Sequence, residues 1–218
     1  MFIINCKNYD EISGEKIIKL AKISQKISKK YKIPIAIAPP HHLIPLIVKF
    51  NVTILAQHLD DKKVGSTTGF MIPEIVKKSK ISGSLINHSE HRISEKEIRN
   101  LVKRLKRLRL KTILCVKNVN ELKKYLKLNP TFIAIEPPEL IGTGRAISTE
   151  KPQLITNAVD SVKSAKNSTK VLCGAGIVSG KDVARAKELG SKGILVASGI
   201  VKAKNWEKII EEFSRALV

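Results

Sequence analysis

The stretch Lys170–Gly176, KVLCGAG, is an apolar run followed directly by small residues. Apolar strands without polar alternation are typical of a parallel sheet that is covered on both faces. Small residues after the strand allow the backbone to turn tightly and to approach a ligand. Similar apolar runs recur along the chain, and together they predict eight strands, at Phe2–Asn5, Ile33–Ala38, Thr53–Gln57, Gly83–Asn87, Thr112–Val116, Phe132–Ile135, Lys170–Cys173 and Gly193–Ala197.

Amphipathic segments lie between these strands. Ser94 with Glu97, and Ser179 with Asp182, have the spacing of a capping box, and Pro152 suits the first turn of another helix. Eight helices are predicted, at Gly14–Lys29, near Ile44–Lys49, at Pro73–Lys78, after Ser94, at Asn120–Lys127, after Thr149, after Ser179 and at Asn205–Leu217.

Strands and helices that alternate in this way predict an α/β fold with one domain over residues 1–218. The two main arrangements are a closed barrel and a doubly wound open sheet. No Gly-x-Gly-x-x-Gly motif follows the first strand, and the alternation is even throughout. We therefore expect an eight-stranded parallel (β/α)8 barrel, a fold that commonly takes about 200–250 residues.

Composition places the chain among ordinary globular proteins, with 43% apolar and 27% charged residues. No apolar stretch approaches the length of a membrane span, and the first residues lack the layout of a signal peptide. Cys6, Cys115 and Cys173 have no CxxC spacing, which predicts buried thiols in a reducing compartment. The sequence thus predicts a cytoplasmic protein without a membrane partner.

The formal net charge of +21 would attract nucleic acid, anionic membranes or phosphorylated substrates. The basic run 103–111 follows Leu101 and includes Leu105, so its cations are interpreted as the solvated side of an amphipathic helix. Aromatic residues make up only 4%, which leaves few platforms for stacking on single strands. We predict no specific nucleic-acid partner, although a basic nucleic-acid-binding protein remains the alternative from a different class.

Polar residues follow several predicted strands, where the active sites of such barrels lie. Glu136 could act as a general base if burial brings its pKa toward neutrality, and His88 could polarise a carbonyl or transfer a proton. Lys7 would place a cation among the strand ends. His41, His42 and His58 supply no third ligand at a recognisable spacing, so no metal is predicted.

Two further features surround these candidates. Pro137 and Pro138 stiffen the backbone after Glu136, and Gly142 and Gly144 follow, which is the pattern of a lid that moves as a body. Small residues after the last two strands fit a phosphate site built from backbone N–H groups. These residues are Gly174, Ala175, Gly176, Ala197, Ser198 and Gly199.

Longer motifs make a family resemblance specific. The segments NCKNY (5–9), AQH (56–58), GSTTG (65–69), NHSE (87–90), IEPPELIGTG (135–144), LCGAGI (172–177) and ASG (197–199) resemble those of triose-phosphate isomerases, in order along nearly the whole chain. The lid motif and the compact length are similar to those of the archaeal branch.

The resemblance implies an intramolecular aldose–ketose isomerase that interconverts dihydroxyacetone phosphate and glyceraldehyde 3-phosphate without a cofactor, in glycolysis and gluconeogenesis. Glu136 would be the base, His88 the electrophile and Lys7 the cation that stabilises the enediolate, with Glu90 in support. Asn5, Ile141, Gly142, Gly174, Gly176, Ala197, Ser198 and Gly199 would bind the substrate. This family is itself a standard example of a glutamate base beside a histidine kept neutral by a helix N-terminus. Residues after His88, from Ser89 or from Ser94, are expected to supply that N-terminus.

Three positions depart from the family pattern, namely Pro40, Phe70 and Arg145. The loop that contains Phe70 corresponds to the family's subunit contact, and the resemblance implies a homodimer or a homotetramer. Another phosphate-binding barrel enzyme would share the last two loops but should lack the ordered set of Asn5, Lys7, His88 and Glu136. A barrel that has lost its activity should not retain that set.

Overall fold

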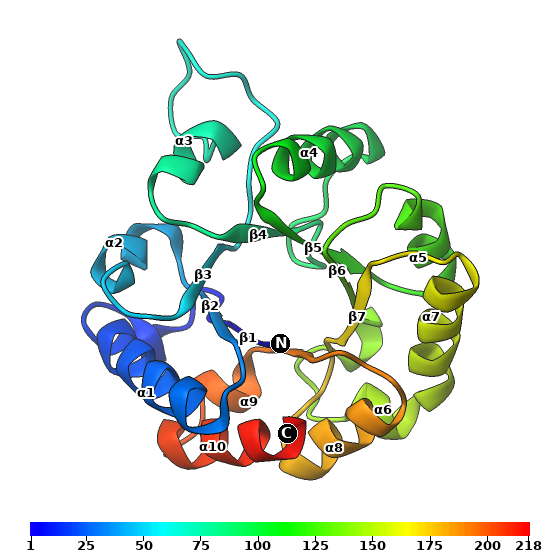
Figure 1. The fold of residues 1–218 in the computed structure, drawn as a ribbon. Coiled ribbons are helices and arrows are strands. Elements are labelled where there is room, and N and C mark those ends of the chain that lie inside the picture. Colours follow the sequence, from blue (N-terminus) through cyan, green and yellow to red (C-terminus); the bar gives the residue numbers. More distant parts are fainter.

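A computed structural model describes all residues from 1 to 218 as a closed barrel of eight parallel strands, surrounded by helices (Figure 1). The strands pair in chain order, and β8 closes the ring against β1. The predicted fold is confirmed, and each strand lies within two residues of its expected bounds. The strands are β1 (Phe2–Asn5), β2 (Ile35–Ala38), β3 (Thr53–Ala56), β4 (Gly83–Ile86), β5 (Lys111–Val116), β6 (Phe132–Ile135), β7 (Lys170–Cys173) and β8 (Ile194–Val196).

Both faces of the sheet are buried, which explains why the strands are apolar without interruption. Along β1, Ile3 belongs to a cluster of 11 buried side chains contributed by the strands, whereas Phe2 and Ile4 belong to a cluster of 49 shared with the helices. Successive residues of a strand point to opposite faces, so the smaller cluster fills the barrel and the larger one lies between strands and helices.

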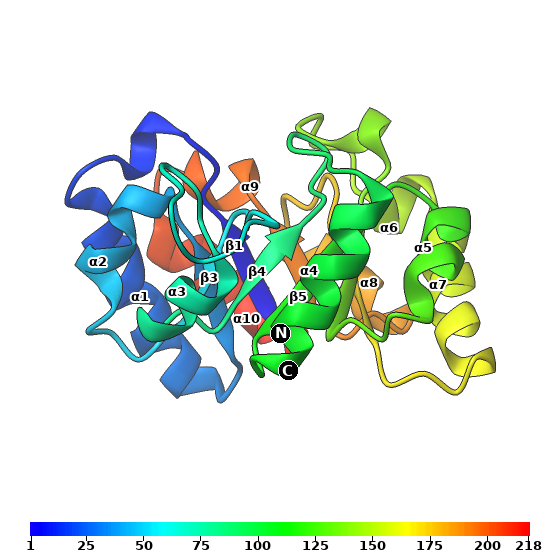
Figure 2. The ribbon, with the colours of Figure 1, turned by 90° about the horizontal axis from the view of Figure 1, so that it is seen from above.

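The helices surround the strands and run back toward the next strand start (Figures 1 and 2). The α-helices are α1 (Lys16–Tyr31), α2 (Ile44–Ile47), α3 (Pro73–Lys78), α4 (Glu95–Arg107), α5 (Val119–Leu126), α6 (Ile147–Glu150), α7 (Pro152–Ser164), α8 (Gly180–Glu188), α9 (Ser198–Val201) and α10 (Trp206–Leu217). Three short 3-10 helices are η1 (Asp10–Ile12), η2 (His41–Leu43) and η3 (Pro138–Leu140).

Local chemistry sets several of the helix starts. Ser94 and Ser179 both form the predicted capping boxes, at the starts of α4 and α8. Asn118 caps α5, so that this helix begins one residue before the predicted Asn120. The expected start of α1 at Gly14 is wrong, because Gly14 has a left-handed φ of 55° and the helix begins only at Lys16.

The two ends of the barrel have different contents. Figure 2 shows both chain termini at the end where the strands begin, and the loops that follow the strands at the opposite end. The segment 57–72, between β3 and α3, projects outward from the ring (Figure 1).

Cys6, Cys115 and Cys173 are free and buried, as predicted. No helix has the length and apolar content that crossing a membrane would require.

The capping box of α4 yields a stability prediction. Ser94→Ala removes the acceptor for the N–H of Glu97 and should lower the free energy of unfolding by about 1 kcal/mol. Urea unfolding followed by circular dichroism would measure the change. The exposed helical residue Ser164 provides a matched control, since Ser164→Ala should change stability by less than about 0.5 kcal/mol. Equal losses in the two variants would contradict the role of the cap.

Candidate active site

One pocket at the carboxyl ends of the strands brings together all but one of the predicted site residues. Glu90 is the exception, and it lies in an adjoining hollow that Lys7 and His88 share with this pocket. The remaining predicted residues line the pocket itself, and they are Asn5, Lys7, His88, Glu136, Ile141, Gly142, Gly174, Gly176, Ala197, Ser198 and Gly199. They come from five different strand ends, which only closure of the barrel brings together.

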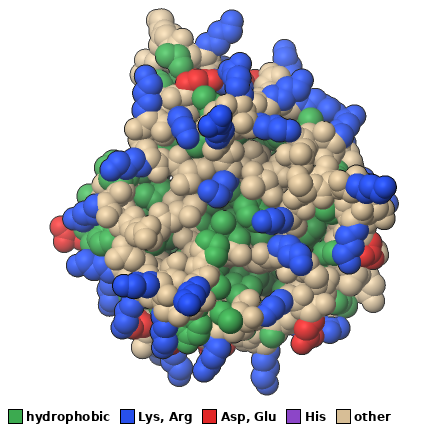
Figure 3. All heavy atoms as spheres, in the orientation of Figure 1, with side chains coloured by type: hydrophobic (Ala, Val, Ile, Leu, Met, Phe, Trp, Pro, Cys, Tyr) green, Lys and Arg blue, Asp and Glu red, His purple; other side chains and the backbone are tan.

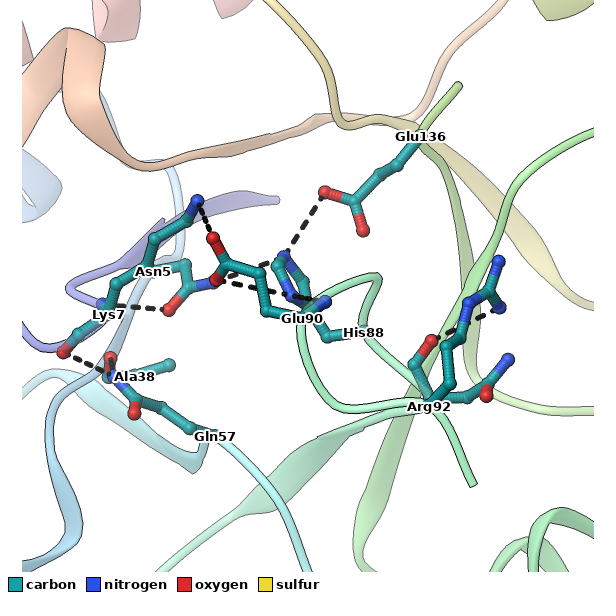
Figure 4. A network of polar contacts seen from close by, with 9 residues as sticks. Asn5, Lys7, Ala38, Gln57, His88, Glu90, Arg92 and Glu136 are labelled. Carbon is teal, nitrogen blue, oxygen red and sulfur yellow. Dashed lines mark hydrogen bonds and ion pairs between the residues drawn. The ribbon is translucent and has the colours of Figure 1, made fainter. Parts of the chain in front are cut away.

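Glu136 is the first residue after β6, and its backbone N–H donates to the carbonyl of Val116 on β5. Its side chain is only 5% exposed, and Oε1 lies 3.7 Å from Nε2 of His88 (Figure 4). Oε2 has no hydrogen-bond partner. Burial raises the pKa of the Glu136 carboxyl above its ordinary value, against smaller opposing contributions from His88, Cys115 and Lys7. A carboxylate in this state is a stronger base than one in water.

Two glycines of the loop after β7 leave room for other parts of the site. A Cβ at Gly174 would lie 2.5 Å from Cγ of Glu136, so the absence of a side chain there allows the carboxylate to lie over the backbone. A Cβ at Gly176 would lie 1.8 Å from the carbonyl oxygen of Arg145, and its φ of 71° also favours glycine. Gly176 therefore accommodates the C-terminal end of the lid.

His88 is held by the turn that follows it. The backbone N–H of Glu90 donates to Nδ1 at 3.2 Å, and the N–H of His91 donates to the His88 carbonyl at 2.8 Å. Because a backbone N–H can only donate, Nδ1 must accept, and in the neutral ring the proton lies on Nε2. The expected helical start at Ser89 is wrong, because this segment is a turn and α4 begins only at Glu95.

The backbone just before His88 is strained and firmly held. Asn87 has a left-handed φ of 61°, and its side chain donates to the carbonyl of Cys115 and accepts from the N–H of Ile93. Arg92 donates to the Asn87 carbonyl at 3.3 Å and also forms an ion pair with Glu121. Such strain is retained where surrounding contacts fix one conformation, and here they fix the position of the imidazole.

Lys7 is also left-handed, with a φ of 46°. Its N–H donates to Oδ1 of Asn5 at 3.0 Å, and its carbonyl accepts from Nε2 of Gln57 at 2.9 Å. Gln57 donates in addition to the carbonyl of Ala38, which joins three strand ends. The Lys7 ammonium lies 2.7 Å from Oε1 of Glu90, and Figure 4 shows this pair beside the His88 ring.

Asn5 completes the group of polar side chains in the pocket. Because its Oδ1 accepts from the Lys7 N–H, its Nδ2 faces Nε2 of His88, at 3.5 Å. Both nitrogens then carry hydrogens, so neither can accept a hydrogen bond from the other, and both are available as donors to a ligand in the pocket. Together with Lys7 they surround a space suited to a polarised carbonyl oxygen.

Backbone donors line the opposite side of the pocket. The N–H groups of Gly176, Ser198 and Gly199 have no acceptor within the chain. Ser198 and Gly199 begin α9, a short helix that the sequence did not predict. Free N–H groups beside a helix start suit an anion such as a phosphate.

The lid is folded on itself. After Pro137 the chain forms η3, and the Thr143 hydroxyl donates to the carbonyl of Leu140 and accepts from the N–H of Arg145. Gly142 and Gly144 both have a φ of 74°. These internal bonds agree with the predicted movement as one body. The Arg145 side chain points away from the pocket contacts and pairs with Glu150.

Sequence reasoning assigned no role to several residues that shape the site. Gln57 and Arg92 hold the backbone of the two strained residues, and Val178 lines the pocket. In the sequence, Gln57 stood out only as a member of the motif AQH (56–58). Arg92 and Val178 carried no local signal that marked them as part of the site.

Comparison with known proteins agrees with this geometry. The family model described as triosephosphate isomerase matches residues 1–213. A triosephosphate isomerase of Cenarchaeum symbiosum is 50% identical over 217 residues, which cover 100% of this chain and 97% of the relative. The corresponding enzyme of Methanocaldococcus jannaschii is 43% identical, with 97% of both chains covered. That of Saccharolobus solfataricus is 42% identical, with 98% of this chain and 94% of the relative covered.

The chain belongs to the triosephosphate isomerase family. It is therefore an isomerase that interconverts triose phosphates, as the sequence predicted, and glycolysis is the general role of this family. The alternative of another phosphate-binding barrel enzyme is set aside by these full-length matches.

Burial of Glu136 predicts how stability depends on pH. At a pH above the raised pKa of the folded state, the Glu136 carboxylate is charged in both the folded and the unfolded protein, and burying that charge destabilises the fold. At a pH below the pKa of the unfolded state, the carboxyl is neutral in both. Glu136→Gln should therefore raise the free energy of unfolding at pH 8, by about 1.4 kcal/mol for each unit by which burial raises the pKa. That gain should disappear as the pH falls to about 4. Urea unfolding of the variant and the wild type across this pH range would measure the difference in the free energy of unfolding.

The exposed Glu139 provides the matched control. A hydrogen bond from Lys151 holds its pKa below the ordinary value, so Glu139→Gln should give no gain in stability at pH 8. A Glu136→Gln variant that is less stable than the wild type at pH 8 would contradict the cost of burying the charge.

Proposed function

We propose that Glu136 moves a proton between the two adjacent carbons of the triose phosphate. The observation that carries this role is the pairing of a buried Glu136 carboxylate with Nε2 of His88 at 3.7 Å, in a pocket lined by backbone donors. The carboxylate takes a proton from the carbon beside the carbonyl, and the resulting enediolate accepts it back on the neighbouring carbon. These side chains suffice for the transfer, and we propose that no cofactor takes part.

His88 acts as the electrophile in this proposal. Its Nε2–H points at the space beside Glu136, because the bond from the Glu90 N–H to Nδ1 leaves Nε2 as the nitrogen that carries the proton in the neutral ring. A neutral donor can polarise the substrate carbonyl and exchange its proton between the two oxygens of the enediolate. Asn5 supports this by placing Nδ2 beside the same oxygen position.

Lys7 supplies the positive charge that the enediolate and the phosphate require. Its fixed backbone carries the ammonium into the pocket, where the side chain is only 13% exposed. Glu90 supports the site by holding this ammonium at 2.7 Å. A preorganised cation in a site with little water stabilises developing negative charge without reorganisation during the reaction.

The substrate phosphate would bind to the loops after β7 and β8. Gly174, Gly176, Ala197, Ser198 and Gly199 line that side of the pocket, and three of them offer free N–H groups. Ile141 and Gly142 line it from the lid. Closure of the lid over a bound phosphate would exclude water and protect the enediolate from side reactions.

Shortening the proposed base tests this mechanism. Glu136→Asp draws the carboxylate back by one methylene and should lower kcat for glyceraldehyde 3-phosphate isomerisation by about 100-fold or more, with a smaller effect on KM. A coupled assay without added metal or cofactor would measure both constants. Glu139→Asp makes the same change on an exposed residue of the adjoining lid and should leave kcat within about twofold. Similar kcat values in the two variants would overturn the assignment.

We further propose a cytoplasmic enzyme that forms a homodimer or a homotetramer. The three free cysteines are compatible with a reducing compartment. The projecting segment 57–72 carries Val64 and Phe70, which are 58% and 43% exposed. Its two aspartates balance its two lysines, so the large positive charge of the chain would not oppose contact there. Exposed apolar groups on a neutral loop are suited to contact with a second copy.

The oligomer can be tested on Phe70. Phe70→Asp would bury a charge in the proposed contact and should shift the molecular mass measured by light scattering toward that of a monomer. Leu46→Asp changes another exposed apolar residue, on α2 outside the segment, and should leave the mass unchanged. An unchanged oligomer in Phe70→Asp would place the subunit contact elsewhere.

A further inference from the structure

The positive charge of the chain is concentrated at one end of the barrel. The αβ segments lead from each helix to the next strand, and five of the seven include the last residues of that helix. They hold sixteen Lys or Arg residues and a single acid, Glu188. The βα segments at the catalytic end hold six Lys or Arg residues and eight acids. The αβ segments are 29–34, 48–52, 77–82, 106–111, 127–131, 164–170 and 187–193. The βα segments are 6–15, 39–43, 57–72, 87–94, 117–118, 136–146, 174–179 and 197. A preference for lysine that was uniform along the chain would have enriched both ends of the barrel in cations.

These cations are free to bind a partner. All sixteen are exposed except Lys111, which is half-buried. Only Lys30 and Arg107 form ion pairs, with Glu211 and Glu74. Figure 3 views the molecule from this end and shows Lys and Arg side chains around the whole face, with few acidic groups among them. We call this surface, made of the αβ segments, the basic face.

The helix dipole explains only part of this distribution. Cations stabilise the last turn of a helix, and the effect fades beyond that turn. Residues such as Lys29, Lys78 and Arg107 fit this explanation. Nine other cations of the basic face lie beyond the helices, in turns or at strand starts, namely Lys32, Lys49, Lys80, Arg109, Lys111, Lys127, Lys166, Lys170 and Lys192.

Backbone conformation gives a second, independent observation. Lys32, Lys80, Arg109 and Lys166 have left-handed φ values of 54°, 59°, 57° and 47°. Glycine or asparagine is the usual residue where the chain leaves a helix in this conformation. Four αβ segments thus place a long cation where folding alone favours glycine, and none of the four side chains forms an ion pair.

We infer that the basic face binds double-stranded nucleic acid through the phosphate backbone, without reading its sequence. Cations spread over seven segments fit an extended polyanion better than a single headgroup, and each phosphate contact releases bound counterions. No aromatic residue is exposed on this face, so stacking on unpaired bases has no platform. Figure 3 also shows apolar side chains at the centre of this face, but no large apolar side chain of the αβ segments is exposed, so an anionic membrane is less suited.

The left-handed positions allow a variant that should fold. Lys32→Gly, Lys80→Gly, Arg109→Gly and Lys166→Gly together remove four cations and relieve the backbone at each site. The matched control removes four exposed, unpaired cations elsewhere, in Lys19→Gln, Lys22→Gln, Lys96→Gln and Lys204→Gln. Both variants carry the same net charge. Fluorescence anisotropy with a labelled random-sequence DNA duplex, from 25 to 300 mM NaCl, would compare them with the wild type.

At 100 mM NaCl the wild type should bind the duplex, and the glycine variant should bind at least about 10-fold more weakly, with a shallower slope against the logarithm of salt concentration. The control should lose less than about threefold. Saturating duplex should leave isomerase kcat/KM unchanged, because the catalytic pocket lies at the other end of the barrel.

Four results would overturn the inference. These are no wild-type binding at 100 mM NaCl, equal losses in the two variants, tighter binding to phosphatidylserine vesicles than to the duplex, and competitive inhibition of the isomerase by the duplex. Equal losses would mean that net charge alone attracts the duplex. Tighter binding to vesicles would mean that the basic face binds a membrane surface, and competitive inhibition would mean that the duplex binds at the catalytic pocket.

Discussion

Parallel closure of the eight strands is the constraint on which the rest of this molecule depends. It directs every strand end of one polarity to the same end of the barrel, so residues from β1, β4, β6, β7 and β8 meet in one pocket. It also buries both faces of the sheet, because side chains of alternating residues fill either the interior or the space beneath the helices. The carboxylate of Glu136 is consequently placed at the edge of an apolar core, where water does not reach it freely.

The site is precise because its backbone is strained and held. Lys7 and Asn87 both adopt left-handed conformations that cost free energy in residues other than glycine, and each is fixed by a hydrogen bond to another strand end. Gln57 bonds to the carbonyls of Lys7 and Ala38, and Asn87 bonds to that of Cys115. The cation and the imidazole thus share a rigid frame, whereas the lid has glycines at 142 and 144 and is anchored by the buried Leu140.

The same closure gives the barrel two chemically different ends. Helix N-termini and strand carboxyl ends share the catalytic end, where backbone donors and a mixed set of charges suit a small phosphorylated substrate. Helix C-termini and strand starts share the other end, which carries half of the unpaired cations of the chain and a single acid. A polyanion on that face would not have to pass the lid or displace a substrate. The two surfaces can therefore act independently on one rigid scaffold.

The sequence by itself determined the fold and most of the pocket. Uninterrupted apolar runs, capping boxes at Ser94 and Ser179, and small residues after β7 and β8 are local signals of strand, helix and loop. Only the tertiary structure decided which group bonds to Nδ1 of His88, the Glu90 N–H and not a helix start, because that depends on turn geometry. It likewise decided the burial of Glu136 over Gly174 and the gathering of scattered lysines on one face. Contacts between segments far apart in the chain leave no mark in local sequence, since they exist only once the barrel closes.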